Sequence, residues 1–191
     1  MKLVFATNNK NKIHEVQHIL PESFQILSLK DINCLEEIPE TQDTIEGNAL
    51  QKSSYVLEHY GYDCFADDTG LEIEALNGEP GVYSAMYAGS QRSSKDNIEK
   101  VLNKLQNIKN REAQFKTVIS LQLKGKVYSF EGICKGEIIL TPKGADGFGY
   151  DPIFKPDGYD MTFAEMPLDV KNKIGHRGKA VQKLISFLKD F

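Results

Sequence analysis

Strand-like and helix-like segments alternate through the first half of this sequence, and a stretch rich in strand formers follows them. The apolar run 3–6 predicts a short buried strand, and the helical spacing of apolar residues over 13–20 predicts a helix. Later in the chain, 115–123 and 127–134 predict a β-hairpin. This order of segments predicts an α/β protein with a mixed sheet flanked by helices.

The length and composition are those of an ordinary globular protein. The chain has 191 residues, of which 40% are hydrophobic and 26% are charged, and no linker or repeat divides it. We therefore expect one domain over residues 1–191, large enough to bury roughly 70% of the surface exposed by the unfolded chain. The net charge of −4 argues against a general partner for nucleic acid polymers or membrane surfaces.

The cysteines and the N-terminus indicate the compartment. Cys34, Cys64 and Cys134 are widely spaced and form no metal-ligand pattern, which favours reduced thiols in a cytosolic protein. No apolar run approaches the roughly 18 to 20 residues of a membrane span. The first residues contain too few apolar side chains for a secretory signal. We expect a cytoplasmic protein with no membrane partner.

The first candidate site is the segment Thr7-Asn8-Asn9-Lys10-Asn11-Lys12, where a predicted strand passes into a predicted helix. Backbone N–H groups and the helix dipole favour an anion at such a place, and two lysines add positive charge. The segment lacks the glycines and the GK[ST] ending of a Walker A loop. The alternative interpretation is a polar connection with solvated lysines.

The second candidate is Asp67-Asp68-Thr69-Gly70, which follows the apolar run 62–66 and interrupts the strand predicted there. Adjacent carboxylates suit Mg²⁺, which prefers a few carboxylates together with water and phosphate oxygens. Consecutive strand side chains point to opposite faces, so the two aspartates are expected to have different roles unless the chain bends between them. The alternative is a simple turn, because this tetrapeptide also has good turn chemistry.

Two more candidates lie in the C-terminal half. The sequence GFGYDPIF (147–154) belongs to a glycine- and proline-rich stretch, 144–158, for which we expect no regular structure. Its aromatic rings either provide a flat face for a nucleobase or fill the core. Lys171 and the group Gly175-His176-Arg177 precede a predicted C-terminal helix, and they either contact phosphate or purine or form a solvated basic turn.

Taken together, these segments resemble the inosine triphosphate pyrophosphatase family, which includes the bacterial dITP/XTP pyrophosphatases. The resemblance runs in order along nearly the whole chain. It rests on TNNKNK (7–12), FADDTGLEIEALNGEPGVYSA (65–85), GFGYDPIF (147–154) and KNKIGHRGKA (171–180). The second and third of these motifs are the most specific.

The resemblance implies a Mg²⁺-dependent enzyme that hydrolyses non-canonical purine nucleoside triphosphates (dITP, ITP and XTP) to the monophosphate and pyrophosphate. It also implies a homodimer. The implied fold is an elongated mixed β-sheet flanked by helices, with two lobes and an active-site cleft between them.

The resemblance further implies roles for individual residues. Asp68 would be the catalytic base and a metal ligand, and Glu40 would be the second metal ligand. The residues implied to bind substrate are Thr7, Asn8, Asn9, Lys10, Asn11, Lys12, Thr69, Phe148, Gly149, Tyr150, Asp151, Lys171, His176 and Arg177.

The chain departs from the family pattern at two places. Met86 stands where the family often has arginine, and a glycine common in bacterial members near Glu40 is missing. Two rival functions are a pyrophosphatase for modified pyrimidine triphosphates, which the TxNxxK opening would also fit, and a nucleotide sensor without hydrolysis. GFGYDPIF and GHRGKA favour the purine enzyme, and the presence of Asp68, Lys12 and Glu40 argues against the sensor.

Overall fold

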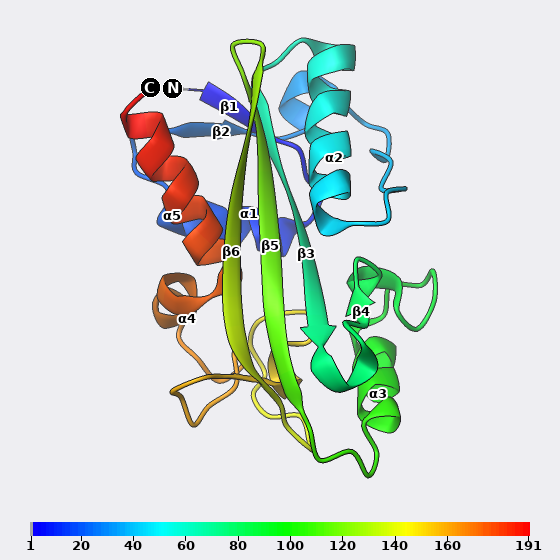
Figure 1. Cartoon of the computed structure of the whole chain (residues 1–191). Helices are drawn as coiled ribbons and strands as arrows, with labels where there is room; N and C mark the ends of the chain where they lie inside the picture. The colour runs from blue at the N-terminus through cyan, green and yellow to red at the C-terminus, as the bar shows by residue number, and fades with distance from the viewer. Residues whose placement is uncertain (1) are drawn as a thin grey trace. The chain divides into compact units, whose positions relative to one another are not determined.

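The computed structural model describes residues 2–191, and these residues form a seven-stranded mixed sheet (Figure 1). The strand order is β2-β1-β3-β5-β6-β7, and β4 pairs with β3. β1 is parallel to β2 and β3, whereas β4 and β7 are antiparallel to their partners β3 and β6. The strands are β1 (Lys2–Phe5), β2 (Gln25–Leu27), β3 (Cys64–Ile73), β4 (Pro80–Gly81), β5 (Glu112–Leu123), β6 (Lys126–Ile138) and β7 (Phe154–Pro156).

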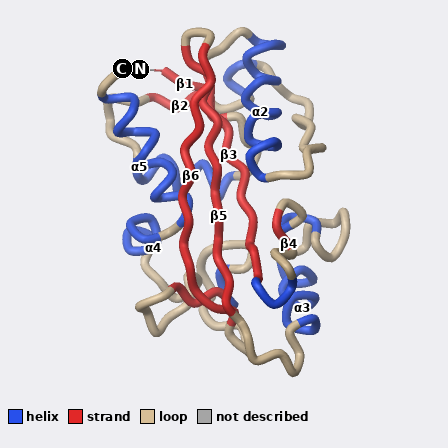
Figure 2. The backbone as a smooth tube through the Cα atoms, in the orientation of Figure 1, coloured by secondary structure: helices blue, strands red, loops and turns tan. Residues whose placement is uncertain are grey.

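Helices flank this sheet, as the backbone trace in Figure 2 shows. The α-helices are α1 (Lys10–Ile19), α2 (Ile45–Tyr60), α3 (Ser94–Lys104), α4 (Leu168–Ile174) and α5 (His176–Lys189). Short 3₁₀ helices are η1 (Lys30–Ile32), η2 (Glu74–Leu76), η3 (Ser84–Met86) and η4 (Asp151–Ile153). The predicted α/β class with a mixed sheet is therefore confirmed.

The chain divides into two compact units. Unit 1 comprises the segment up to Asp68 together with Thr117–Gly132 and Arg177–Phe191, and unit 2 comprises Thr69–Lys116 and Ile133–His176. The long strands β3, β5 and β6 contribute residues to both units. Each unit has its own hydrophobic core. The cleft expected between two lobes stays a prediction.

In unit 1, side chains alternate between the two faces of the sheet. Leu3 and Phe5 pack in one cluster with apolar residues of α1 and α5, whereas Val4 and Ala6 pack in another with Val56 of α2. This alternation is the period-two pattern of a strand that is buried on both faces. Helices therefore cover both sides of β1.

The core of unit 2 is built around aromatic rings. The ring of Phe154 lies 4.7 Å from that of Phe115 and 5.1 Å from that of Phe163, measured between centroids. Helix α3 adds Ile98 and Val101 to the same cluster. These contacts fix the start of β7 and hold the chain that follows the GFGY segment.

Several sequence predictions need correction. Strand β3 continues through Asp67-Asp68-Thr69-Gly70 instead of ending before it, because buried lysines neutralise the aspartates, as described below. Residues 144–158 include η4 and β7, although a glycine-rich stretch was expected to be irregular. The hairpin strands also extend further than 115–134, since β5 begins at Glu112 and β6 ends at Ile138.

The residues that the structure describes were expected to contain no membrane span and only reduced cysteines. Over 2–191, no helix is both long enough and apolar enough to cross a membrane. Cys34, Cys64 and Cys134 are all buried, and no disulfide joins them. Burial raises the pKa of the Cys64 thiol to about 12, so this residue is an inert part of the core.

Candidate functional site

Two adjacent aspartates on β3 point to opposite faces of the sheet. Asp67 lies on the face covered by α1 and α5, where it contacts Lys12 and Arg177. Asp68 lies on the other face, within reach of Lys52 from α2. The strand alternation that predicted separate roles for the two carboxylates is therefore observed.

Asp67 is the centre of a buried ionic network in unit 1. Its Oδ1 accepts a hydrogen bond from Lys12 Nζ at 3.1 Å, and its Oδ2 accepts one from Arg177 Nε at 3.0 Å. Arg177 also pairs with Glu15, and both side chains are almost fully buried. Burial alone would raise the pKa of Asp67, but the charges of Lys12 and Arg177 outweigh it and hold this pKa well below its usual range.

This network leads to a prediction about stability. Replacing Asp67→Asn removes the charge that compensates two buried cations, and breaking a buried pair in this way costs about 3 kcal/mol. We expect the melting temperature to fall by roughly 10 °C for a chain of this size. Thermal unfolding followed by circular dichroism measures the change, and an unchanged melting temperature would show that the network contributes nothing to folding.

Asp68 lies beside two charged groups on the α2 face. Lys52 Nζ is 3.5 Å from Asp68 Oδ1, donates a 2.8 Å hydrogen bond to the backbone oxygen of Asp67, and pairs with Glu40. Burial raises the pKa of Asp68 despite the nearby Lys52 ammonium. Burial lowers the pKa of Lys52, but the charges of Asp68 and Glu40 outweigh it, and the net pKa is raised. The lysine therefore stays charged beside a carboxylate with raised basicity.

The two carboxylates fit a magnesium ion that also uses substrate oxygens. Within residues 2–191, Asp68 Oδ2 is buried and has no hydrogen-bond partner, so one basic oxygen remains available. The described residues contain no group of three or more His, Cys, Asp or Glu side chains that could hold a metal by themselves. Mg²⁺ commonly binds through one or two carboxylates plus waters and phosphates. Asp68 and Glu40 would hold such an ion only together with a bound polyphosphate.

Residues 7–12 form the connection from β1 into α1. Asn9 is the N-cap, and its side chain accepts hydrogen bonds from the backbone N–H groups of Asn11 and Lys12. The first turn of α1 contains no acidic residue, so no carboxylate of the helix itself offsets the positive end of its dipole. Lys10 is exposed, but the side chain of Lys12 is only 13% exposed, so the alternative of solvated lysines is wrong for Lys12.

In unit 2, Asp151 connects two other predicted residues. Its Oδ2 accepts a 2.8 Å hydrogen bond from the backbone N–H of Phe148 and a 2.6 Å one from Lys171 Nζ. The same ammonium lies 5.0 Å from the centroid of the Phe148 ring. Gly147 permits this arrangement, because a Cβ there would lie 2.2 Å from Asp151 Oδ2. Lys171 is buried, so the solvated basic turn is wrong at this position.

The remaining predicted residues of unit 2 differ in exposure. Tyr150 is buried and donates a 2.7 Å hydrogen bond to the backbone oxygen of Ser84, so its ring fills the core. Phe148 and Gly149 are half-buried, and Thr69 is half-buried in β3. His176 is buried and stacks on Phe115 with ring centroids 4.5 Å apart. Phe148 is thus the aromatic ring of this motif that can offer a face to a base.

Comparison with known proteins agrees with these observations. A family model described as the Ham1 family matches residues 3–187. The chain belongs to the Ham1 family. It is 69% identical over 188 residues to a dITP/XTP pyrophosphatase of Flavobacterium johnsoniae, with 98% of both chains covered. A Porphyromonas gingivalis dITP/XTP pyrophosphatase is 48% identical, with 98% of this chain and 97% of the relative covered.

Solved structures of Ham1 proteins have the same fold. The Staphylococcus aureus Ham1 protein aligns with a TM-score of 0.90 and 40% identity, covering 100% of this chain and 99% of the other. A Coxiella burnetii HAM1 protein aligns with a TM-score of 0.92 and 34% identity over the full length of both chains. The family resemblance inferred from four motifs is therefore confirmed.

Sequence reasoning missed Lys52 in this Ham1-family chain. A weak signal was present, since Lys52 falls at helical spacing between Ala49 and Val56 on the apolar side of α2. A lysine on a buried helix stripe needs a carboxylate partner. Glu15 carried a similar signal, because it lies in α1 next to the buried Val16 and is itself buried. Asp67 was noticed, but its partners were not.

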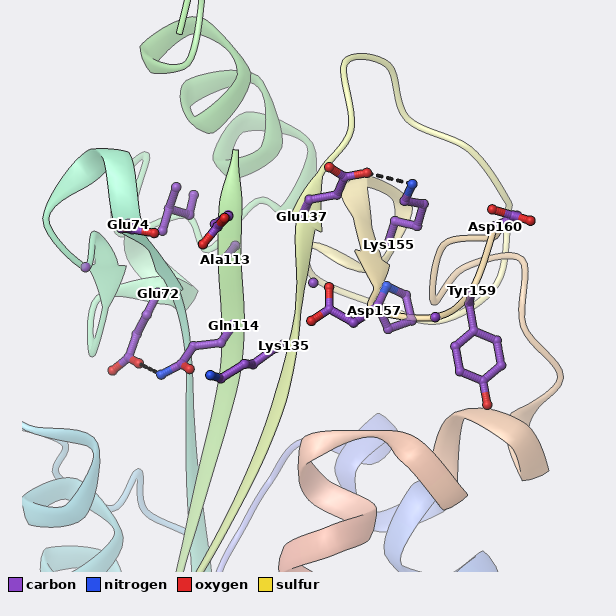
Figure 3. Close-up of a pocket in the computed structure, with 16 residues that line it drawn as sticks. Glu72, Glu74, Ala113, Gln114, Lys135, Glu137, Lys155, Asp157, Tyr159 and Asp160 are labelled. Atoms are coloured by element: carbon purple, nitrogen blue, oxygen red, sulfur yellow. Dashed lines mark hydrogen bonds and ion pairs between the residues drawn. The ribbon is translucent and has the colours of Figure 1, made fainter. Parts of the chain in front are cut away.

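A separate hollow in unit 2 has a volume of about 1050 Å³ and is shown in Figure 3. None of the predicted site residues is among the described residues that line it. Lys135 and Lys155 face a larger number of carboxylates there, from Glu72, Glu74, Glu112, Glu137, Asp157 and Asp160. This excess of negative charge would repel a triphosphate, which distinguishes the hollow from the sites described above.

Proposed function

We propose that this chain is a Mg²⁺-dependent nucleoside triphosphate pyrophosphatase that converts dITP, ITP and XTP to the monophosphate and pyrophosphate. The observation that carries the proposal is Asp68, a buried carboxylate with one unpartnered oxygen beside Lys52 and Glu40. A Flavobacterium johnsoniae protein named dITP/XTP pyrophosphatase is 69% identical to this chain, and its name supports the proposed substrate class.

In this proposal the chain's own residues divide the work. Asp68 accepts a proton from the attacking water, a role that suits its raised pKa. The ammonium groups of Lys12 and Lys52 neutralise charge that develops on the triphosphate. A Mg²⁺ ion held by Asp68 and Glu40 would supply Lewis-acid stabilisation of the phosphate oxygens. Residues 7–11 and Arg177 complete the phosphate side of the site.

Recognition of the base is assigned to unit 2. The half-buried ring of Phe148, supported by Asp151 and Lys171, provides a face for the purine. Thr69, Gly149, Tyr150 and His176 are proposed to shape the same subsite. Hypoxanthine and xanthine carry an oxygen at C6, where adenine carries an amino group. Hydrogen-bond donors of the protein that face C6 would pair with that oxygen but would be left unpaired by adenine, which disfavours adenine nucleotides.

The experiment that tests this function is a pyrophosphate-release assay with dITP, XTP, dUTP and GTP, with and without Mg²⁺. The proposal expects rapid release from dITP and XTP only when Mg²⁺ is present. Preference for dUTP would identify a pyrimidine enzyme instead. Binding without release from any of the four nucleotides would identify a sensor.

The resemblance also supports three proposals about the whole protein. Residues 1–191 act as one functional domain, two copies form a homodimer, and the protein works in the cytoplasm. The family model's span of residues 3–187 is consistent with a single functional domain.

Lys12→Ala should slow dITP turnover by roughly 10²-fold, about 2.7 kcal/mol, the effect expected when one preorganised stabilising group is lost. Because Lys12 is largely buried against Asp67, the variant should also lose some stability, in contrast to a solvated lysine. Steady-state kinetics with dITP measure the first effect and thermal unfolding the second. An unchanged rate would remove Lys12 from the triphosphate site.

A further inference from the structure

Segment 40–42 is attached to α2 by side chains that follow one face of the helix. Three helix residues bind three consecutive residues in reverse order: Asn48 binds Gln42, Gln51 binds Thr41 and Lys52 binds Glu40. Helix positions separated by three and four residues lie on the same face, which explains how one helix reaches all three.

The contact with Thr41 is bidentate. Gln51 Oε1 accepts a 2.9 Å hydrogen bond from the Thr41 backbone N–H, and Gln51 Nε2 donates a 2.9 Å hydrogen bond to Thr41 Oγ1. Asn48 Oδ1 accepts the backbone N–H of Gln42 at 2.9 Å, and Asn48 is almost fully buried. The backbone directly after Glu40 is therefore fixed by hydrogen bonds to a rigid helix.

Gly47 allows the segment to approach α2 this closely. A Cβ at this position would lie 2.8 Å from the Cβ of Gln42 and 2.9 Å from Oγ1 of Thr44. Thr44 is the N-cap of α2, and its side chain accepts the backbone N–H of Gly47. Any larger residue at position 47 must push Gln42 or Thr44 away from the helix.

These contacts matter because Glu40 lies on an irregular segment. The segment belongs to neither a helix nor a strand, and the Glu40 side chain is 34% exposed. A carboxylate on such a segment contributes to a cation site only when its backbone is held in place, since partners outside the ligand set orient the ligands.

We propose that Asn48, Gln51 and Gly47 are positioning residues that set the affinity of the site for its divalent cation, by fixing Glu40 beside Lys52 and Asp68. This inference rests on the proposed function for the identity of the cation. It adds that metal affinity depends on three α2 residues that are neither ligands nor substrate contacts.

The test compares Gln51→Ala and Gly47→Ala with the control Glu58→Ala, which alters an exposed residue of the same helix. Binding of Mn²⁺, an EPR-active substitute for Mg²⁺, is measured with a dITP analogue whose α–β bridge resists hydrolysis. The Mg²⁺ concentration for half-maximal dITP turnover, kcat at saturating Mg²⁺ and the melting temperature are measured alongside.

Both variants should weaken Mn²⁺ binding by about 10-fold or more, the usual effect of losing a partner that orients a metal ligand. Saturating Mg²⁺ should restore kcat to within about threefold, because the groups that act on the substrate remain. Gly47→Ala should leave the melting temperature nearly unchanged, because the better helix propensity of alanine offsets the crowding of the N-cap Thr44 by the new Cβ. A purely structural role would instead lower the melting temperature and leave Mn²⁺ affinity unchanged.

The possible outcomes separate the two proposals. Unchanged Mn²⁺ affinity in both variants, with normal turnover by the wild-type protein, would overturn the inference and leave the proposed function intact. A similar loss of affinity in Glu58→Ala would also overturn it. Wild-type protein that neither binds Mn²⁺ with the analogue nor hydrolyses dITP would overturn both proposals.

Discussion

Asp68→Asn is expected to lower dITP turnover by at least about 10³-fold, which corresponds to about 4 kcal/mol of activation free energy. The amide has no basic oxygen to take a proton from water. It also removes one negative charge from a cation site that has few carboxylates. Nucleotide binding should persist. Its affinity should increase, because the Asp68 carboxylate no longer repels the triphosphate. Turnover and nucleotide affinity are compared at matched Mg²⁺.

The same substitution should leave the fold intact. Asparagine is nearly isosteric with aspartate, and burial already disfavours the charged form of Asp68, as its raised pKa shows. The melting temperature of Asp68→Asn should therefore stay at or above that of the wild-type protein. Asp67→Asn serves as the matched control, because it should lose stability and retain more turnover than Asp68→Asn. Near-normal hydrolysis by Asp68→Asn would refute the assignment of the base.

Strand geometry made part of the site around β3 predictable, namely the directions of its two aspartate side chains. The period of two residues requires Asp67 and Asp68 to face opposite sides of the sheet, whichever helices cover those sides. The partners could not be predicted, because Lys12, Lys52 and Arg177 are far from β3 in the sequence. The same lack of known partners made Asp-Asp-Thr-Gly resemble a turn, although the strand passes through it.

The segment before α2 shows a different limit of prediction from sequence. Asp43, with Glu46 three residues on, could cap this helix, but the structure uses Thr44 as the N-cap. A shift of one residue is an ordinary difference for a helix boundary. The family resemblance implied Glu40 as a metal ligand, but the residues that hold its segment become visible only in three dimensions.

The aromatic motif illustrates what local pattern cannot resolve. Phe148 and Tyr150 both adjoin Gly149, so the sequence left a base-binding face and a core plug equally open. The structure shows that the Tyr150 ring is buried in the core, whereas Phe148 is half-buried and its base-binding role stays a proposal. Packing with residues far away in the sequence made that difference, in particular the hydrogen bond from Tyr150 to Ser84.

Lys52→Met should have the second large effect, a loss of turnover of about 10³-fold, near the upper end for removal of one preorganised charge. Methionine keeps the apolar stem but removes the ammonium that lies 3.5 Å from Asp68 and pairs with Glu40. Without it, the two carboxylates repel each other and the backbone oxygen of Asp67 loses its 2.8 Å hydrogen bond. Stability should fall by about 3 kcal/mol as well, because buried charges lose their partner.

Because Lys52→Met changes both stability and charge, turnover must be measured on folded protein, well below the melting temperature of the variant. The control is Lys95→Met, whose side chain is 84% exposed on α3 and should change neither turnover nor stability appreciably. If Lys52 acts only through folding, turnover per folded molecule will equal that of the control at low temperature. If its ammonium stabilises charge on the triphosphate, the deficit of about 10³-fold will persist there, because low temperature restores folding but not the missing positive charge.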